Sequence, residues 1–308
     1  MSGVKLLPLW RFWLVAGLVA FQILLLAVSH DRPVLNCMGV FFILAFAVSI
    51  YRSPDFDFLL YAATCRRLPG RGFVLRFKVR LVEKKALQTY ADFCQREYDD
   101  LVRLFGFSLR HQVSIYLFGS ANEIKRITRT LYDLPCDGKF KITIQAALPH
   151  SACVHPDTDA ILMPVDEEFQ TTVRHELAHL FARRIGPEDF LFKCEGLAMW
   201  VEYQGQSPRL SDHAISVLKE MKTLESFLDD TLFFAPSTCY ASYEIARSFA
   251  GFLIERFGWA TYCGFYKHAK HGKFLAAFEE AFSMTLADAE ALWREDIGSE
   301  PKSDACIS

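Results

Sequence analysis

Two histidines with a glutamate between them stand near the middle of this 308-residue chain. Residues 175 to 179 read His175-Glu176-Leu177-Ala178-His179, which is an HExxH motif. In a helix, residues four apart lie about one turn apart on the same side, so both imidazoles can reach one metal ion. Glu176 neighbours the first histidine and remains uncommitted to the metal, which suits a general base. The alternative interpretation is an exposed, salt-bridged helix face.

Apolar residues surround the motif at helical spacing. They lie on roughly the opposite face of the expected helix: Val173, Leu177, Leu180 and Phe181. Such a helix can bury one side and still present its histidines to a cleft. This arrangement favours a pair of metal ligands over histidines buried in a core.

Catalytic zinc usually keeps three protein ligands and leaves one position for water. The third candidate ligand is Glu195, sixteen residues after His179, at the start of the segment Glu195-Gly196-Leu197-Ala198-Met199-Trp200-Val201-Glu202. We expect this segment to open a helix, where the helix dipole favours a carboxylate, and an acid without a metal is the alternative. Glu202 lies two turns along and is either a hydrogen-bond partner of a ligand or a solvated acid.

These residues resemble the gluzincin peptidases, most closely the peptidase MA-like domains related to the catalytic domains of aminopeptidase N and thermolysin. In that family the HExxH helix is followed by an E-G-x-A-x-aromatic-x-E segment whose first acid completes the zinc site. The similarity extends over about residues 85 to 297 and includes an edge strand like Asp159 to Pro164 and a helix like Tyr243 to Gly258. The resemblance implies a Zn²⁺-dependent peptidase with a zincin-like fold.

By the same analogy Tyr243 stabilises the oxyanion. Tyr240 is a second candidate for this role. The alternative for either ring is that it only packs in the core or lies on the surface. Two features depart from the family pattern. Cys194 stands where many relatives have Asn or Ser before the ligand glutamate, and no G-x-M-E-N-like segment precedes the motif. The sequence therefore carries no signal for exopeptidase specificity.

The functional hypothesis is a zinc metallopeptidase that hydrolyses peptide bonds in a peptide or protein substrate. His175, His179 and Glu195 hold the zinc, and Glu176 takes a proton from the attacking water. One alternative is an inactive binding or scaffold protein with a peptidase-like fold and structural zinc. Another is a non-peptidase zinc hydrolase.

The expected elements describe an α+β domain with a small mixed α/β lobe followed by a helical lobe. Residues 85–105 have helical periodicity ending at Gly106, and three short β-type runs follow at 113–118, 140–146 and 160–163. Six helices are expected at 167–185, 195–204, 211–228, 240–257, 259–270 and 285–296. The two lobes meet at the HExxH motif.

The first 51 residues hold two uncharged apolar runs of 18 residues each, Phe12 to Ser29 and Val34 to Tyr51. Each is long enough to cross a bilayer, and only four residues separate them, so we expect a transmembrane helical hairpin. A signal peptide cleaved near Ala27-Val28-Ser29, followed by one span, is the alternative.

The turn between the two runs has one basic residue, Arg32. The outer flanks have many more: Lys5, Arg11, Arg52, Arg66, Arg67, Arg71, Arg76, Lys78 and Arg80. The positive-inside rule then predicts an integral protein of the cell or inner membrane, with its catalytic domain in the cytoplasm. Residues 73–82 alternate apolar and cationic side chains, which predicts a strand facing either anionic membrane lipids or solvent.

The expected domain organisation is a hairpin at 1–51, a basic connector at 52–84, a peptidase MA-like domain at 85–297 and a tail at 298–308. The net charge of -2 and the lack of a basic, aromatic-interleaved patch argue against a nucleic-acid partner. The nine cysteines are odd in number and contain no CxxC pair, which indicates reduced thiols.

Overall fold

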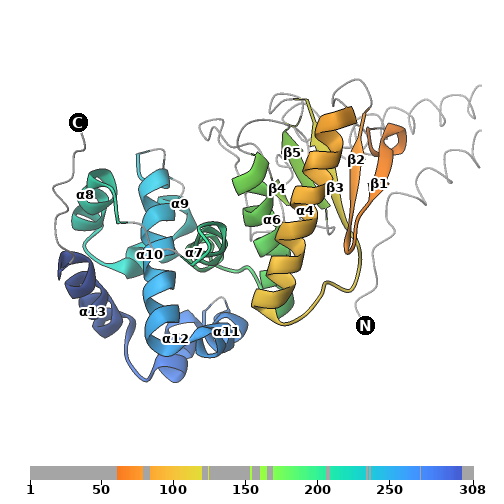
Figure 1. Cartoon of the computed structure of the whole chain (residues 1–308). Coiled ribbons are helices and arrows are strands. Elements are labelled where there is room, and N and C mark those ends of the chain that lie inside the picture. The colour runs from red at the N-terminus through yellow and green to blue at the C-terminus, as the bar shows by residue number, and fades with distance from the viewer. Residues whose placement is uncertain are drawn as a thin grey trace, which may run out of the picture.

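The computed structural model describes residues 61–78, 84–119, 124, 153–154, 160–164, 169–205, 209–233, 235, 237–270 and 272–299. Figure 1 shows two lobes side by side, one built on a β-sheet and one built of helices. The predicted α+β class, with a small mixed lobe followed by a helical lobe, describes this part of the chain.

The sheet has the strand order β1-β2-β3-β5-β4. Its centre is parallel, formed by β2 (Phe73–Phe77), β3 (Val113–Phe118) and β5 (Ala160–Pro164), and its edges β1 (Arg66–Pro69) and β4 (Cys153–Val154) run antiparallel to their neighbours. The strand expected from the alternation after residue 72 is therefore β2, which belongs to the same sheet as β3.

Two helices pack against the sheet lobe's core, α4 (Lys84–Phe105) and α6 (Phe169–Ile185). Alternate residues of β2, including Phe73 and Leu75, join Val173 and Leu177 of α6 in one buried cluster. Gly106 follows α4 with a φ of +77°, a left-handed conformation that suits glycine and ends the helix as the sequence predicts.

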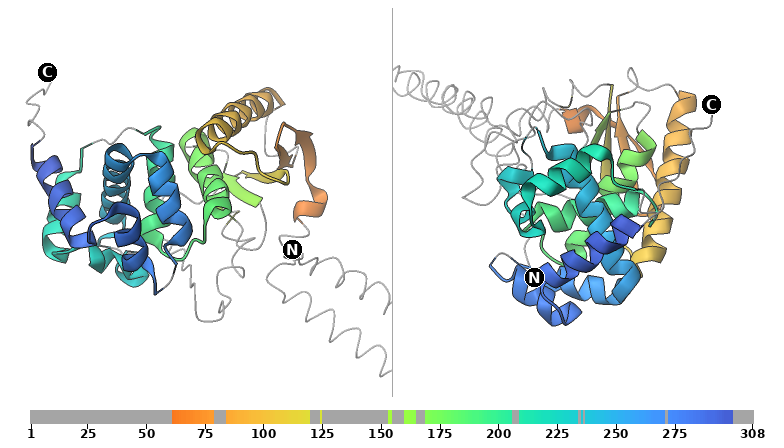
Figure 2. Two further views of the ribbon diagram at one scale, coloured as in Figure 1. Left: turned by 90° about the horizontal axis from the view of Figure 1, so that it is seen from below. Right: turned by 90° about the vertical axis from the view of Figure 1, so that its left-hand side faces the viewer.

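The helical lobe begins with α7 (Leu191–Glu202), which contacts both α6 and the central helix α10 (Cys239–Phe257). The other helices surround α10, as the two views of Figure 2 show, and are α8 (Asp212–Met221), η1 (Leu224–Leu228), α9 (Asp230–Phe233), α11 (Trp259–His268), α12 (Phe274–Phe282) and α13 (Leu286–Ser299). The site helices α6, α7 and α10 thus lie next to one another where the lobes meet (Figure 1).

Most predicted elements are present with shifted ends. The single helix expected at 211–228 is broken at Lys222, whose φ of 64° is left-handed, so α8 and η1 are separate. The resemblance predicts an edge strand at Asp159 to Pro164, but β5 pairs with β3 on one side and with β4 on the other. The run expected at 140–146 lies outside the described residues.

The prediction of an integral membrane protein with a transmembrane hairpin is corrected. Within the described ranges, no helix combines the length and apolar character needed to span a bilayer. The two longest, α4 and α10, carry charged residues along their length, for example Arg96 and Glu97 in α4 and Glu244 and Arg247 in α10. The two apolar runs before residue 52 lie outside the described residues.

Candidate metal centre

Helix α6 carries the HExxH residues at the boundary between the lobes. The apolar residues that the sequence places on the opposite face, Val173, Leu177, Leu180 and Phe181, are all at most 1% exposed. Their burial fixes the rotation of the helix, so that the side chains of His175 and His179 face α7. The predicted placement of the apolar residues on one face and the histidines on another is therefore observed.

Helix α7 supplies Glu195 from its second turn. The helix begins at Leu191 rather than at Glu195, because Leu191 and Phe192 are buried and the Cys194 N–H donates to the carbonyl of Phe190. The expected support of the carboxylate by a helix N-terminus is therefore wrong. Packing holds Glu195 in place instead, since α7 crosses α10 closely at Gly196.

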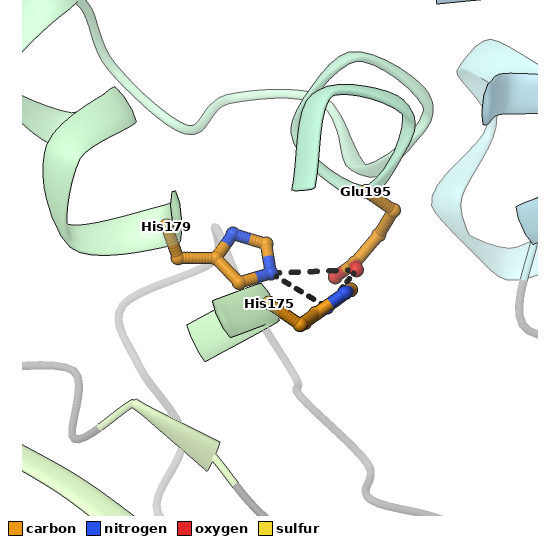
Figure 3. Close-up of side chains that lie close together, drawn as sticks. All are labelled: His175, His179 and Glu195. Atoms are coloured by element: carbon orange, nitrogen blue, oxygen red, sulfur yellow. Dashed lines mark hydrogen bonds and ion pairs between the residues drawn. The ribbon is translucent and has the colours of Figure 1, made fainter. Parts of the chain in front are cut away.

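The three predicted ligand residues meet at one point (Figure 3). The Nε2 atoms of His175 and His179 are 3.2 Å apart, and the Oε2 atom of Glu195 lies 3.2 Å from the first and 3.4 Å from the second. That oxygen is buried and accepts no hydrogen bond from any described residue. The three atoms form a nearly equilateral triangle of possible metal ligands.

Each histidine has a carboxylate within hydrogen-bond distance of its Nδ1 atom. The Nδ1 atom of His175 lies 2.9 Å from Oε2 of Glu202, and Nδ1 of His179 lies 2.9 Å from Oε1 of Glu188. A carboxylate that accepts a hydrogen bond from Nδ1 fixes the proton on that nitrogen, so Nε2 of each ring faces the centre and offers a lone pair there whenever the ring is neutral. Three potential ligand atoms this close together favour a cation between them, either a proton or a metal ion.

The pKa shifts of His175, His179 and Glu195 also favour a cation at the centre of the cluster. Burial lowers the pKa of His175, but the carboxylates of Glu195 and Glu202 outweigh it and raise the pKa to about 9. Burial also opposes the charged form of His179, yet Glu195 and Glu188 raise its pKa well above the usual range. Burial raises the pKa of Glu195, and the two histidines reverse this and lower it. The cluster therefore stabilises positive charge at its centre.

Glu176 lies beside this cluster and is 7% exposed. Burial raises the pKa of its carboxyl group, and the nearby histidines partly offset that rise. Within the described part of the chain, no side chain forms a hydrogen bond or an ion pair with it. The carboxylate is therefore available to a water or substrate proton.

Tyr243 is one of two tyrosines on α10, and its phenol lies near the carboxylates of the site. Burial raises the pKa of its phenol, and the nearby carboxylates of Glu195 and Glu176 and the thiol of Cys239 raise it further. Its ring packs 5.3 Å from the ring of Phe233. Tyr240 is 48% exposed. The nearness of Tyr243 to these carboxylates and the exposure of Tyr240 favour Tyr243 as the candidate hydroxyl.

A buried ion pair between Arg174 and Glu97 connects α6 to α4, one residue before His175. Arg174 Nη1 lies 2.5 Å from Glu97 Oε2 on α4, and its Nε donates to the carbonyl of Val201 on α7 at 2.7 Å. Both charged residues are less than 9% exposed. Arg174 therefore ties α4 and α6 to the end of α7 that carries Glu202.

Several of these residues are not recognisable from the sequence. Glu188 has an adjacent acid, Asp189, and nothing in the residue order tells which of them reaches His179. Arg174 and Glu97 are 77 residues apart, so their pairing appears only when α4 packs on α6. Cys194, the departure from the family pattern, is 3% exposed and its sulfur accepts a hydrogen bond from Tyr266 at 3.6 Å.

Comparison of the chain with protein-family models and with curated proteins finds no match.

Proposed function

We propose that the chain is a zinc-dependent hydrolase of peptide bonds, of the gluzincin type. The observation that carries the proposal is the convergence of two Nε2 atoms and one carboxylate oxygen beside the uncommitted carboxylate of Glu176. The resemblance of the motif residues to gluzincins supports the same activity.

The donor set fits zinc. Two imidazoles and one carboxylate are a common ligand set of catalytic zinc, whereas Ca²⁺ and Mg²⁺ prefer oxygen ligands. Zinc bonds of about 2.0–2.1 Å in a tetrahedron separate the ligand atoms by about 3.3 Å. The separations of 3.2, 3.2 and 3.4 Å in the cluster agree with that value.

The residues of the chain then have the following roles. His175, His179 and Glu195 hold the zinc, which when bound lowers the pKa of a water molecule and polarises the scissile carbonyl. Glu176 accepts a proton from the attacking water and returns it to the leaving nitrogen. Tyr243 donates a hydrogen bond to the oxygen that becomes negative during the attack.

Cleavage of a peptide library by the full chain, together with metal analysis, tests the proposal. We expect about one zinc per chain and cleavage that a chelator abolishes and zinc restores. Glu176→Gln should keep the metal and lose cleavage, because the amide cannot accept the proton. Glu280→Gln, which changes an exposed acid on α12, is the matched control and should cleave normally.

Two results would reject this assignment. Cleavage by Glu176→Gln at the wild-type rate would show that Glu176 is not the general base. Bound zinc without cleavage of any peptide would favour a scaffold with structural zinc.

A further inference from the structure

We propose that Glu188 is the positioning residue for His179 and that Lys193 fixes the loop from which Glu188 acts. The inference rests on the proposed function in one respect, because it takes His179 as a metal ligand. It assigns a role to the connection between α6 and α7, residues 186–190, which carries none of the ligands.

Both oxygens of the Glu188 carboxylate are engaged. Oε1 lies 2.9 Å from Nδ1 of His179, and Oε2 accepts a hydrogen bond of 2.5 Å from Nε of Arg183. His179 and Arg183 are four residues apart on α6, so one carboxylate spans two successive turns of the same helix. This two-point contact fixes the plane of the carboxylate and, through it, the orientation of the imidazole.

The loop that carries Glu188 is held from the opposite side by a buried lysine. Lys193 is 2% exposed, and its Nζ donates to the carbonyl of Pro187 at 2.6 Å. The same Nζ reaches the carbonyls of Ala269 and Tyr266, at 2.8 and 3.4 Å, at the end of α11. An ammonium group has three protons, and here each of them has a carbonyl partner.

The backbone of the loop also packs tightly against α11. A Cβ built on Gly186 would lie 2.7 Å from the carbonyl oxygen of Tyr266 and 2.8 Å from the Cα of Lys267. The loop therefore contacts the same carbonyl that Lys193 binds. These contacts connect the end of α11 to Glu188, and Glu188 connects to His179.

The two histidines are supported differently as a result. Glu202, the partner of His175, is part of α7 and is held by the helix itself. Glu188 lies between helices and depends on the contacts of its loop. The orientation of His179 is thus the part of the metal centre that depends on the α6–α7 loop and, through Lys193, on the end of α11.

The test measures metal affinity in the absence of substrate. Metal-free full-length chain is titrated with Zn²⁺ against a competing chelator, and the Co²⁺-loaded form is examined by visible absorption. Removal of an outer partner of a metal-bound histidine typically weakens metal binding about 10–100-fold. We expect that loss for Glu188→Ala, a smaller loss for Glu188→Gln, and a changed Co²⁺ spectrum for both.

Glu290→Gln is the matched control. Glu290 is a buried acid that pairs with Arg294 and accepts from the Leu224 N–H, so its replacement costs stability without touching the site. Zinc affinity should stay unchanged in this variant. A loss of affinity as large as that of Glu188→Ala would mean that affinity reports only general destabilisation, which would overturn the proposal.

Lys193→Met tests the second link. If Lys193 acts through Glu188, the single substitution Lys193→Met weakens zinc binding. The same substitution then causes no further loss in a chain that already has Glu188→Ala. Additive losses would overturn the role of Lys193, and wild-type affinity in Glu188→Ala would overturn the role of Glu188. The Glu188 variants still decide the main claim if Lys193→Met does not fold. Failure of the wild-type chain to bind zinc would instead reject the proposed function.

Discussion

Replacing Gly196 by alanine tests whether the close crossing of α7 and α10 builds the site. A Cβ at Gly196 would lie 2.7 Å from the carbonyl oxygen of Ala246 and 3.1 Å from its carbonyl carbon. Both atoms belong to the backbone, so a side-chain rotation cannot relieve the contact. One helix must move away from the other by about 0.7 Å before the distance from the Cβ to the carbonyl oxygen becomes that of an ordinary contact.

Two opposing energies set the size of the effect. Alanine favours a helix interior over glycine by about 1 kcal/mol. Overpacking of a tight contact costs about 1–3 kcal/mol. Gly264→Ala in α11 separates the two terms, because a Cβ there meets no atom within 4 Å. That variant should gain stability, whereas Gly196→Ala should lie about 1–3 kcal/mol below it.

Thermal unfolding of both variants measures the difference. For a domain of about 150–250 residues, 1 kcal/mol shifts Tm by about 2–4 °C. Gly196→Ala should also lose activity about tenfold or more, because Glu195 is the adjacent residue and catalysis is sensitive to small displacements. Equal stability and equal activity of the two variants would refute the idea that this crossing positions Glu195.

Three further predictions follow from the site. Tyr243→Phe should lower kcat about 10²–10³-fold in a peptide-cleavage assay, and Tyr240→Phe, which changes an exposed ring, should leave kcat unchanged. Arg174→Met leaves the buried carboxylate of Glu97 without its partner and should cost about 3–5 kcal/mol by urea unfolding; a loss below about 1 kcal/mol would contradict the buried pair. In metal-free protein the pKa of His175 rises from 6.5 to about 9, so its contribution to stability is complete below pH 6.5 and is lost as the pH rises to about 9. Unfolding with a chelator present should show that fall, and a rise in stability over the same range would contradict it.

The sequence by itself determined the local features of the site. Spacing of four residues in a helix brings His175 and His179 to one side, and the apolar residues between and around them dictate which side is buried. These are short-range properties of a helix, so no tertiary information is needed to read them. The helix and strand positions follow from the same periodicities, with errors mainly at their ends.

The sequence offers Glu195 and Glu202 as candidates, but only the tertiary structure decided which distant residues meet the histidines. Glu195 and Glu202 reach the histidines because α7 packs on α6, and Glu188 reaches His179 because its loop packs against the end of α11. Such contacts depend on how whole helices cross, and a crossing is set by the shapes of many side chains at once. The preference for Tyr243 over Tyr240 has the same origin, since the packing of α10 on α7 brings Tyr243 near Glu195 and leaves Tyr240 exposed.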